Sequence, residues 1–199
     1  MPYVLPHPIE TQRLIIREVE ARDMDALFAI HNNPEVTRYI PHMHWPTREQ
    51  ADVWFARLLD RREKKSAVQC AVIRRAASDE PYAVIGTLVL FNFEEASALA
   101  EIGWLLGAQF WHRGYMQEAM LAFIDCAFNV LDLRRLEAAV DSRNLASNTL
   151  AERMGFVREG VLRERWIGAG ELQDVHLFGL LRRDWDATRG TVSLPTLCA

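Results

Sequence analysis

The most restrictive feature of this sequence is a long amphipathic segment that begins after Gly114. Its apolar residues recur in a double row with helical spacing over roughly three turns: Ala119, Met120, Phe123, Ile124, Ala127, Phe128 and Leu131. A helix with so wide an apolar face must pack against an apolar surface of similar length. The strand-like run Leu99–Leu106 lies just before it in the chain. We therefore predict a strand, a short loop and a long buried helix at the centre of the fold.

Other segments have strand or helix patterns on both sides of this centre. Strands are predicted at residues 13–18, 68–74, 83–93, 99–106, 136–140, 156–167 and 172–181. Helices are predicted at residues 23–32, 47–65, 115–131 and 145–154, and the second begins with a capping box formed by Thr47 and Gln50. This order of elements predicts a mixed α/β (α+β) fold with about seven strands and about four helices.

The length and composition fit one folded domain. The chain has 199 residues, of which 50% are hydrophobic and 25% charged, so it can bury a substantial core without disulfides or metal ions. We assign residues 1–188 to a single domain and residues 189–199, which show no pattern, to a mobile C-terminal tail. No internal repeat or interdomain linker interrupts the chain.

Charge and cysteine content exclude several classes of protein. The 23 Lys and Arg residues against 27 Asp and Glu residues give a net charge of −4, so no overall basic field would attract nucleic acid or a membrane surface. The three cysteines form no CxxC pair, and His42 and His44 have no third ligand near them in the sequence, so we expect no metal site. The N-terminus lacks the pattern of a signal peptide, and no apolar run is long enough to span a membrane, which predicts a cytoplasmic protein.

The segment between the central strand and the central helix has the character of an anion site. Its residues are Trp111, His112, Arg113, Gly114, Tyr115 and Met116. A helix N-terminus presents unpaired N–H groups and a partial positive charge, a glycine lets an anion approach the backbone, and an arginine adds a charge. Taken alone, the segment is better explained by a glycine at a strand-to-helix turn, because it matches neither common phosphate-binding glycine motif.

A second group of motifs, about 30 residues further along, changes this assessment. Asn144-x-x-Ser147 opens a helix, and Gly155-Phe156-x-x-Glu159-Gly160 follows its end. With Thr11-Gln12-Arg13-Leu14, Glu101-Ile102-Gly103-Trp104 and Trp111-x-x-Gly114-Tyr115-Met116-x-Glu118-Ala119, the sequence resembles the GNAT acetyltransferase superfamily, in particular its ribosomal-protein-alanine (Rim-type) N-terminal acetyltransferases. The resemblance covers residues 11–185. It implies the acyl-CoA N-acyltransferase fold, whose mixed, mostly antiparallel sheet is splayed in the middle.

The resemblance also implies acetyl-CoA as the cosubstrate and no metal. In such enzymes the CoA pyrophosphate lies on the loop that enters the central helix, here residues 111–116, and the motif residue Asn144 contacts CoA. The pantetheine arm pairs like another strand with the backbone that corresponds to Trp104, Leu105 and Leu106. Trp111 and Met116 depart from the superfamily pattern Gln/Arg-x-x-Gly-x-Gly/Ala at its first and last positions, as this branch often allows.

Acetyl transfer to an amine needs a base, because only the neutral amine attacks. An α-amine with a pKa of about 7.7–8 needs little help, whereas deprotonating a lysine near 10.4 costs about 4 kcal/mol at neutral pH. Two carboxylates are candidates for the base, of which Glu101, at the cofactor strand, is our first choice. The other is Glu164, which strand alternation would place on one face with Trp166. A surface ion pair with neighbouring arginines explains Glu164 equally well.

The departing thiolate needs a proton donor. Many superfamily members have a tyrosine seven residues after the motif asparagine, but here that position is Ala151, and Ala139 stands where some N-terminal acetyltransferases keep a glutamate base. The resemblance leaves Ser147 as the candidate donor. The plainer alternative is that Ser147 satisfies backbone N–H groups at a helix start, and that Asn144 is only an N-cap.

Several aromatic and histidine residues have secondary roles in this interpretation. We expect the irregular stretch 34–46 to wall the acceptor pocket with Tyr39, His42, His44 and Trp45. The periodic positions of Trp54 and Trp104 place their side chains in the core. His176 is a secondary candidate for proton relay, although a structural histidine fits its position better.

The sequence thus predicts a cytoplasmic, acetyl-CoA-dependent N-acetyltransferase that works by direct attack in a ternary complex. The preferred acceptor is a protein N-terminal α-amine, as on a ribosomal protein. One alternative acceptor is a small amine (a polyamine, an amino acid or an aminoglycoside-type antibiotic), which Asp or Glu side chains near residues 31–46 would favour. Another alternative is a non-catalytic acyl-CoA-binding regulatory module, which Ala151 would favour. The oligomeric state, a homodimer included, stays open.

Overall fold

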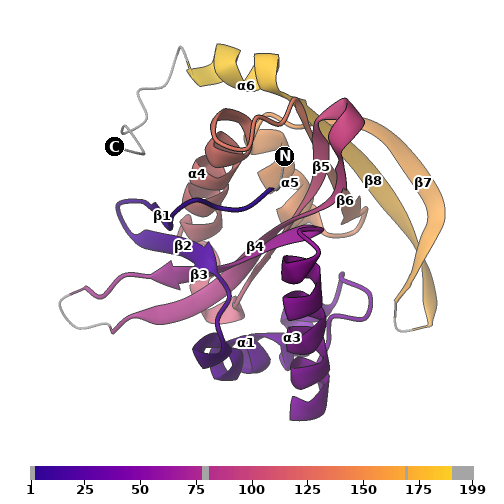
Figure 1. The fold of residues 1–199 in the computed structure, drawn as a ribbon. Coiled ribbons are helices and arrows are strands. Elements are labelled where there is room, and N and C mark those ends of the chain that lie inside the picture. The colour runs from indigo at the N-terminus through magenta and orange to yellow at the C-terminus, as the bar shows by residue number, and fades with distance from the viewer. Residues whose placement is uncertain (1–2, 78–80, 169, 190–199) are drawn as a thin grey trace.

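One mixed sheet of eight strands organises the chain in the computed structural model, which describes residues 3–77, 81–168 and 170–189 (Figure 1). The strands are β1 (Ile9–Glu10), β2 (Leu14–Glu18), β3 (Ala67–Arg74), β4 (Ala83–Glu94), β5 (Leu99–Leu106), β6 (Arg135–Asp141), β7 (Val157–Gly168) and β8 (Glu171–Leu181). Their order across the sheet is β1-β2-β3-β4-β5-β6-β8-β7. Only β5 and β6 run parallel, and every other neighbouring pair is antiparallel.

Helices cover both faces of this sheet. The α-helices are α1 (Met24–His31), α2 (Pro34–Thr37), α3 (Arg48–Glu63), α4 (Tyr115–Asn129), α5 (Leu145–Arg153) and α6 (Arg182–Arg189), and the 3-10 turns are η1 (Ala21–Asp23), η2 (Glu95–Ser97) and η3 (Ala108–Phe110). Alternate residues of β3 show the two faces: Cys70 and Val72 pack in the core with α4 and α5, whereas Ala71 and Ile73 pack with α1 and α3. We call these the α4/α5 face and the α1/α3 face.

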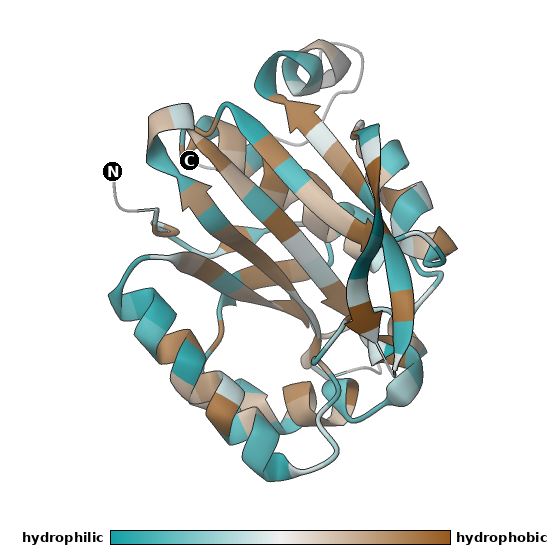
Figure 2. Cartoon of the chain, turned by 90° about the vertical axis from the view of Figure 1, so that its right-hand side faces the viewer, coloured by the Kyte–Doolittle hydropathy of each residue, from teal (hydrophilic) through white to brown (hydrophobic). Residues whose placement is uncertain are grey.

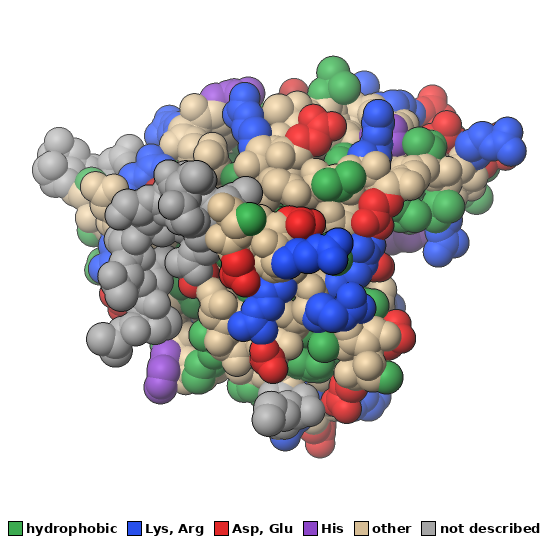
Figure 3. All heavy atoms as spheres, turned by 90° about the horizontal axis from the view of Figure 1, so that it is seen from above, with side chains coloured by type: hydrophobic (Ala, Val, Ile, Leu, Met, Phe, Trp, Pro, Cys, Tyr) green, Lys and Arg blue, Asp and Glu red, His purple; other side chains and the backbone are tan. Residues whose placement is uncertain are grey.

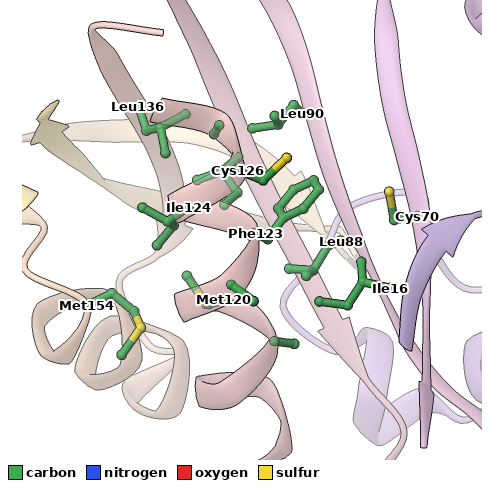
Figure 4. Close-up of a cluster of buried hydrophobic side chains, with 14 of the residues drawn as sticks. Ile16, Cys70, Leu88, Leu90, Met120, Phe123, Ile124, Cys126, Leu136 and Met154 are labelled. Atoms are coloured by element: carbon green, nitrogen blue, oxygen red, sulfur yellow. The ribbon is translucent and has the colours of Figure 1, made fainter. Parts of the chain in front are cut away.

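The larger core lies between α4 and the centre of the sheet. Met120, Phe123 and Ile124 on α4 are at most 1% exposed. In Figure 4 the ring of Phe123 lies beside Leu88 of β4. Helix α3, by contrast, is mostly hydrophilic along its length (Figure 2), and only Ala51 and Leu58 of its residues are buried. The central helix therefore contributes far more apolar packing than the helix on the other face.

Most of the predicted elements are confirmed, including the mixed, mostly antiparallel sheet and the capping box at Thr47 and Gln50. The sequence analysis missed β1, which has two residues, and α6, which follows β8 directly and buries Trp185 in the main core. Both elements are too short for a hydrophobic period to stand out. The tail predicted for residues 189–199 lies, apart from Arg189 at the end of α6, outside the described residues.

The sheet opens between its two parallel strands. β5 and β6 pair only through Leu99–Arg135, Ala100–Leu136 and Glu101–Glu137. Beyond these pairs β5 continues to Leu106 and β6 to Asp141 with no register between them. On the β6 side of β5, the backbone N–H and C=O groups after Glu101 are therefore left without a strand partner, which buried backbone rarely tolerates unless water or a ligand pairs with it.

The surface shows mixed charge. On the face seen in Figure 3, acidic and basic side chains are interspersed. Opposite charges on the surface form salt bridges in places, as at Arg182 and Asp132. No helix in the described part of the chain is long and apolar enough to cross a membrane. Within the same residues, no three His, Cys, Asp or Glu side chains come together in a way that could hold a metal ion.

The packing of α4 gives a stability prediction. We expect Phe123→Ala to lower the free energy of unfolding by about 3–5 kcal/mol, because it deletes a fully buried ring from the main core. Leu145→Ala is the matched control, since this side chain is 75% exposed, and should change stability by less than about 0.5 kcal/mol. Urea denaturation followed by circular dichroism measures both. Equal losses in the two variants would contradict this account of the core.

Candidate active site

A cleft of about 630 Å³ occupies the opening between β5 and β6. Its floor is the sheet, and its walls come from the loop after α2, from α3, from the start of α5 and from the end of β7 near the β7–β8 turn. Among the predicted site residues, the cleft is lined by Glu101, Trp104, Leu105, Asn144 and Ser147. The structure thus brings together residues from two elements, β5 and the start of α5, that are up to 46 positions apart in the chain, Glu101 to Ser147.

The two faces of β5 divide the cleft. Leu105 packs with α1 and α3, and strand alternation places Glu101 and Gly103 on the same side. Ile102 packs with α4 and α5, and Trp104 lies on that side too. The carboxylate of Glu101 therefore projects toward the α1/α3 face, while Trp104 projects toward α5. A molecule in the cleft can be reached from both faces of the sheet.

Gly103 keeps the floor of the cleft open on the α1/α3 face. A Cβ atom at this position would lie 3.0 Å from Cγ1 of Val89, which is tighter than ordinary packing. Any larger residue would also project a side chain over the strand next to Glu101. The glycine therefore leaves the backbone of β5 accessible where it separates from β6.

Glu101 is the only predicted base that lines the cleft. Burial raises the pKa of its carboxyl, and so does the negative charge of Glu137 at the paired position of β6. A hydrogen bond from Asn92 and the positive charge of Arg165 lower this pKa, but the net effect is a raised pKa. An ionised carboxylate with a raised pKa is a better proton acceptor than an ordinary glutamate. Its position and its pKa both suit a general base.

Asn92 positions this carboxylate through a distortion of β4. The register between β4 and β5 shifts between Phe91 and Glu94, and Asn92 has a φ of 50° within this bulge. Asparagine tolerates this left-handed conformation better than most residues. The bulge lets the Asn92 Nδ2 donate to Glu101 Oε2 at 3.0 Å. An asparagine within a strand-like pattern was the signal that could have revealed this partner.

Ser147 lies across the opening, on the side of Trp104. Trp104 Nε1 donates a hydrogen bond to Ser147 Oγ at 3.3 Å, and the backbone N–H of Ser147 donates to Asn144 Oδ1 at 3.1 Å. Because the indole occupies a lone pair of the hydroxyl, the Ser147 proton stays available to a third group. Trp104 was expected in the core; it packs against the core on the α4/α5 face and also lines the cleft, where it orients Ser147. Asn144 is the N-cap of α5, as its plainer interpretation held.

The turn from β6 to α5 is held by a buried carboxylate. Asp141 is 1% exposed, and its two oxygens accept hydrogen bonds from the backbone N–H and the guanidinium of Arg143. The backbone carbonyl of Asp141 accepts from Nδ2 of Asn148, whose Oδ1 lies 2.7 Å from Nδ1 of His176. His176 therefore helps to fix Asn148 on α5 through a hydrogen bond. The guanidinium of Arg143 neutralises the charge of Asp141.

The predicted anion loop lies at the far end of β5 and does not line the cleft itself. His112 and Gly114 have φ values of 59° and 76°, and no side chain from the described residues caps the N-terminus of α4. The N–H groups of the first turn are thus free to bind an anion. Trp111 Nε1 donates to the carbonyl of Leu106 at 2.8 Å, which fastens the loop to the end of β5.

A partly exposed cluster of hydrogen bonds near the N-terminus holds the same loop. Thr11 Oγ1, the backbone N–H of Arg13 and Arg13 Nε all donate to the carboxylate of Glu118, at 2.6, 2.9 and 2.6 Å. Burial alone would raise the pKa of Glu118, but these hydrogen bonds and the charge of Arg13 outweigh it and hold the pKa low. Arg13 also donates to the carbonyl of Arg113 and lies 4.6 Å over the ring of Tyr115. The motifs around Arg13 and Glu118 therefore contact each other across 105 residues.

Glu164, the second predicted base, lies outside the cleft. The register between β7 and β8 shifts between Leu162 and Trp166, Glu164 has a φ of 53°, and its backbone N–H donates to Asp174. The bulge breaks the alternation, so the prediction that Glu164 and Trp166 share a face of a regular strand is wrong. Arg165 and Trp166 line the cleft instead.

The loop that follows α2 forms part of the cleft wall, but only some of the residues predicted to line the cleft do so. Tyr39 and His42 line it, whereas Trp45 is 3% exposed and stacks on the buried ring of His31, 3.8 Å away. Burial lowers the pKa of His31 to about 4, so its ring is neutral and Nδ1 can donate to the carbonyl of Met43 at 2.9 Å. His31, which the sequence analysis did not single out, thus anchors the wall.

The comparison with known families identifies this arrangement. A model of the acetyltransferase (GNAT) domain matches residues 13–157. The chain belongs to the GNAT acetyltransferase family. It is an N-acetyltransferase of this type, and the family implies acetyl-CoA as its cosubstrate. The fold predicted from the sequence motifs, with a sheet splayed at its centre, is confirmed.

Individual relatives agree on the family and differ on the acceptor. The uncharacterized N-acetyltransferase p20 of Bacillus licheniformis is 33% identical over 175 residues, which cover 88% of this chain and 96% of p20. A crystal structure of a GCN5-related N-acetyltransferase from Brucella melitensis is 25% identical, with a TM-score of 0.79, and the match covers 92% of this chain and 82% of that one. YdaF of Bacillus subtilis (strain 168), named provisionally as a ribosomal N-acetyltransferase, is 30% identical over 104 residues, which cover 52% of this chain and 57% of YdaF. Other relatives, at 27% and 22% identity, are named for an L-amino acid and for spermidine.

The contact between Asn92 and Glu101 gives a prediction about pKa. Asn92→Gly keeps the left-handed backbone but removes the hydrogen bond that lowers the pKa of Glu101, so this pKa should rise. Asn92→Asp removes the donor and adds a negative charge, so the rise should be larger. Carbon-13 NMR titration of the glutamate carboxyl groups measures it, with Glu101→Gln to assign the signal. An unchanged pKa in both variants would show that Asn92 does not control this carboxylate.

Proposed function

We propose that this N-acetyltransferase, like the Rim-type enzymes it resembles, transfers the acetyl group of acetyl-CoA to the α-amine of a protein N-terminus. The supporting observation is Glu101, which among the carboxylates that the structure describes is the one with a raised pKa and lies on the α1/α3 face of the opening. One such base suffices for an α-amine, whose pKa of about 7.7–8 leaves part of it neutral at physiological pH. The acceptor then enters from the α1/α3 face and the thioester lies toward α5.

The acetyl group would pass directly from sulfur to nitrogen in a ternary complex. Glu101 accepts the proton that the attacking amine loses, directly or through one water molecule. A backbone N–H of β5 near Leu105 or Leu106 stabilises the oxyanion of the tetrahedral intermediate. The Ser147 hydroxyl, held by the indole of Trp104, donates a proton to the thiolate as the C–S bond breaks.

The cosubstrate would bind along β5 and at the start of α4. The unpaired edge of β5 at Trp104–Leu106 offers N–H and C=O groups to the amides of the pantetheine arm. The pyrophosphate would lie on the segment 111–116, where the first turn of α4 is uncapped and Arg113 is exposed. Asn144 lines the cleft and keeps Nδ2 for the cosubstrate, because its Oδ1 caps α5.

Residues 1–188 would act as one domain, which the burial of Trp185 in the core supports.

The alternative acceptors have less support. Glu or Asp side chains from residues 31–46 would favour a polyamine or an aminoglycoside, but in the described structure that stretch contributes Tyr39, Ile40, Pro41, His42 and Met43 to the cleft and no carboxylate. The ribosomal assignment of YdaF agrees with a protein acceptor. A non-catalytic module is disfavoured because the family is one of N-acetyltransferases.

A set of acceptors tests the proposal. Acetyl-CoA is mixed with peptides that have a free α-amine, with the same peptides blocked at the α-amine but carrying a lysine, and with spermidine; release of free thiol is followed. We expect turnover with the free α-amine and slower turnover, by roughly two orders of magnitude, with lysine, because of the extra cost of its deprotonation. Mass spectrometry locates the acetyl group. Faster turnover of spermidine or lysine than of any α-amine would refute the proposal.

The proton donor can be tested separately. Ser147→Ala should lower kcat by about 10²-fold with little change in KM for acetyl-CoA, because the donor acts on the leaving thiolate. Trp104→Phe keeps an aromatic ring but loses the N–H that orients the hydroxyl, so kcat should fall to a smaller extent. Leu145→Ala, on an exposed position of the same helix, is the control. A change confined to KM would assign Ser147 to binding or capping instead.

A further inference from the structure

Two cationic side chains line the cleft without forming a salt bridge to any residue that the structure describes. Arg61 reaches it from α3 and Arg165 from β7, and both are exposed. In the parts of the chain that the structure describes, neither guanidinium has an ion pair or hydrogen bond. The neighbouring Arg62, by contrast, pairs with Glu18 at 3.1 Å and donates to the carbonyl of Val19. Arg61 and Arg165 are therefore free to bind a group on a ligand.

The carboxylates of the cleft are already engaged. Within the described residues, Glu101 and Asp141 are the acidic residues that line it. Both oxygens of Asp141 accept hydrogen bonds from Arg143, and Glu101 accepts one from Asn92 and is the proposed base. An acceptor with a second ammonium group would find no carboxylate to bind it and two guanidinium groups to repel it. An acceptor with an anionic group would instead be attracted by the two guanidinium groups and could form charge-assisted hydrogen bonds with them.

The position of Arg165 relates this anionic group to the reacting amine. Glu101 and Arg165 line the same cleft, and the charge of Arg165 acts on the Glu101 carboxyl. Arg61 lies on the α1/α3 face, which is also the face toward which Glu101 projects. A group bound by Arg165 is thus held close to an amine that gives its proton to Glu101, and Arg61 adds positive charge on the same face of the cleft.

We infer that the acceptor carries a carboxylate next to its amine, and that Arg61 and Arg165 select for it; the preferred substrates are then protein N-termini with an acidic residue directly after the first residue. This inference rests on the proposed function, because it takes the α-amine of a protein as the acetyl acceptor. A free amino acid also carries a carboxylate, its α-carboxylate, next to its amine. The experiment distinguishes a free amino acid from a protein N-terminus as the acceptor.

The test compares peptides that differ only at their second residue. Three peptides begin Ala-Asp, Ala-Asn and Ala-Lys, and kcat/KM is measured for each with saturating acetyl-CoA. We expect kcat/KM of the Asp peptide to exceed that of the Asn peptide by about fivefold, because a carboxylate forms charge-assisted hydrogen bonds with the two exposed guanidinium groups and an amide does not. The Lys peptide should be the poorest, and added salt should narrow the differences because it screens the charges.

Variants assign this preference to the two arginines. The double substitution Arg61→Gln with Arg165→Gln should bring the Asp/Asn ratio close to one, while Arg165→Glu should favour the Lys peptide. Arg57→Gln on α3 and Arg163→Gln on β7 are matched controls, because both arginines are exposed and lie outside the cleft. Each ratio is taken within one variant, so any change in the pKa of Glu101 that the substitution causes in the free enzyme cancels from the ratio.

The outcomes distinguish the inference from the proposed function. Equal kcat/KM for the three peptides in the unaltered enzyme would overturn the inference and leave the proposed function intact. Acetylation of free glutamate and alanine, but not of their C-terminal amides or of any peptide, would support the carboxylate site and refute a protein acceptor. A preference for spermidine over all of these would overturn both. A ratio that survives the double substitution would refute the role of Arg61 and Arg165.

Discussion

The separation of β5 from β6 is the constraint on which the site depends. The two parallel strands share three residue pairs and then part, so the following backbone of β5 has no strand partner on that side. A sheet normally satisfies these groups within itself, and leaving them unpaired costs stability unless something else binds them. In this protein the unpaired backbone groups of β5 lie at the cleft. A cosubstrate with its own amide groups can restore the missing hydrogen bonds, which makes the opening a binding site as well as a break in the sheet.

The opening also joins the two faces of the sheet, and the chemistry is divided between them. Strand alternation on β5 directs Glu101 to the α1/α3 face and Trp104, with Ser147, to the α4/α5 face. A base is needed where the amine arrives and a proton donor where the thiolate departs. The pleat of one strand therefore separates the two proton transfers by placing their side chains on opposite sides of the acetyl group.

Periodic features could be predicted from the sequence, and local distortions could not. The double row on α4 and the capping box at Thr47 each reflect a repeated or short-range pattern, and both elements were found where expected. Asn92 and Glu164 sit in bulges with positive φ, where β4 has one extra residue relative to β5 and β7 has two relative to β8, so the side chains within the bulges no longer follow simple alternation. The same bulges explain why Glu101 gained a partner and Glu164 left the cleft. The contact of Arg13 with Glu118 spans 105 residues, and no local pattern contains such information.

The proposed acceptor charge has a consequence for the base. Burial and Glu137 raise the pKa of Glu101, whereas Asn92 and Arg165 lower it. An acceptor carboxylate bound to Arg165 would cancel part of the positive charge that Glu101 experiences, and so raise its pKa further. By linkage, the protonation of Glu101 and the binding of such an acceptor favour each other. Glu101 would thus become a stronger base only once the amine is in place, and Arg165 would connect acceptor selection to proton transfer.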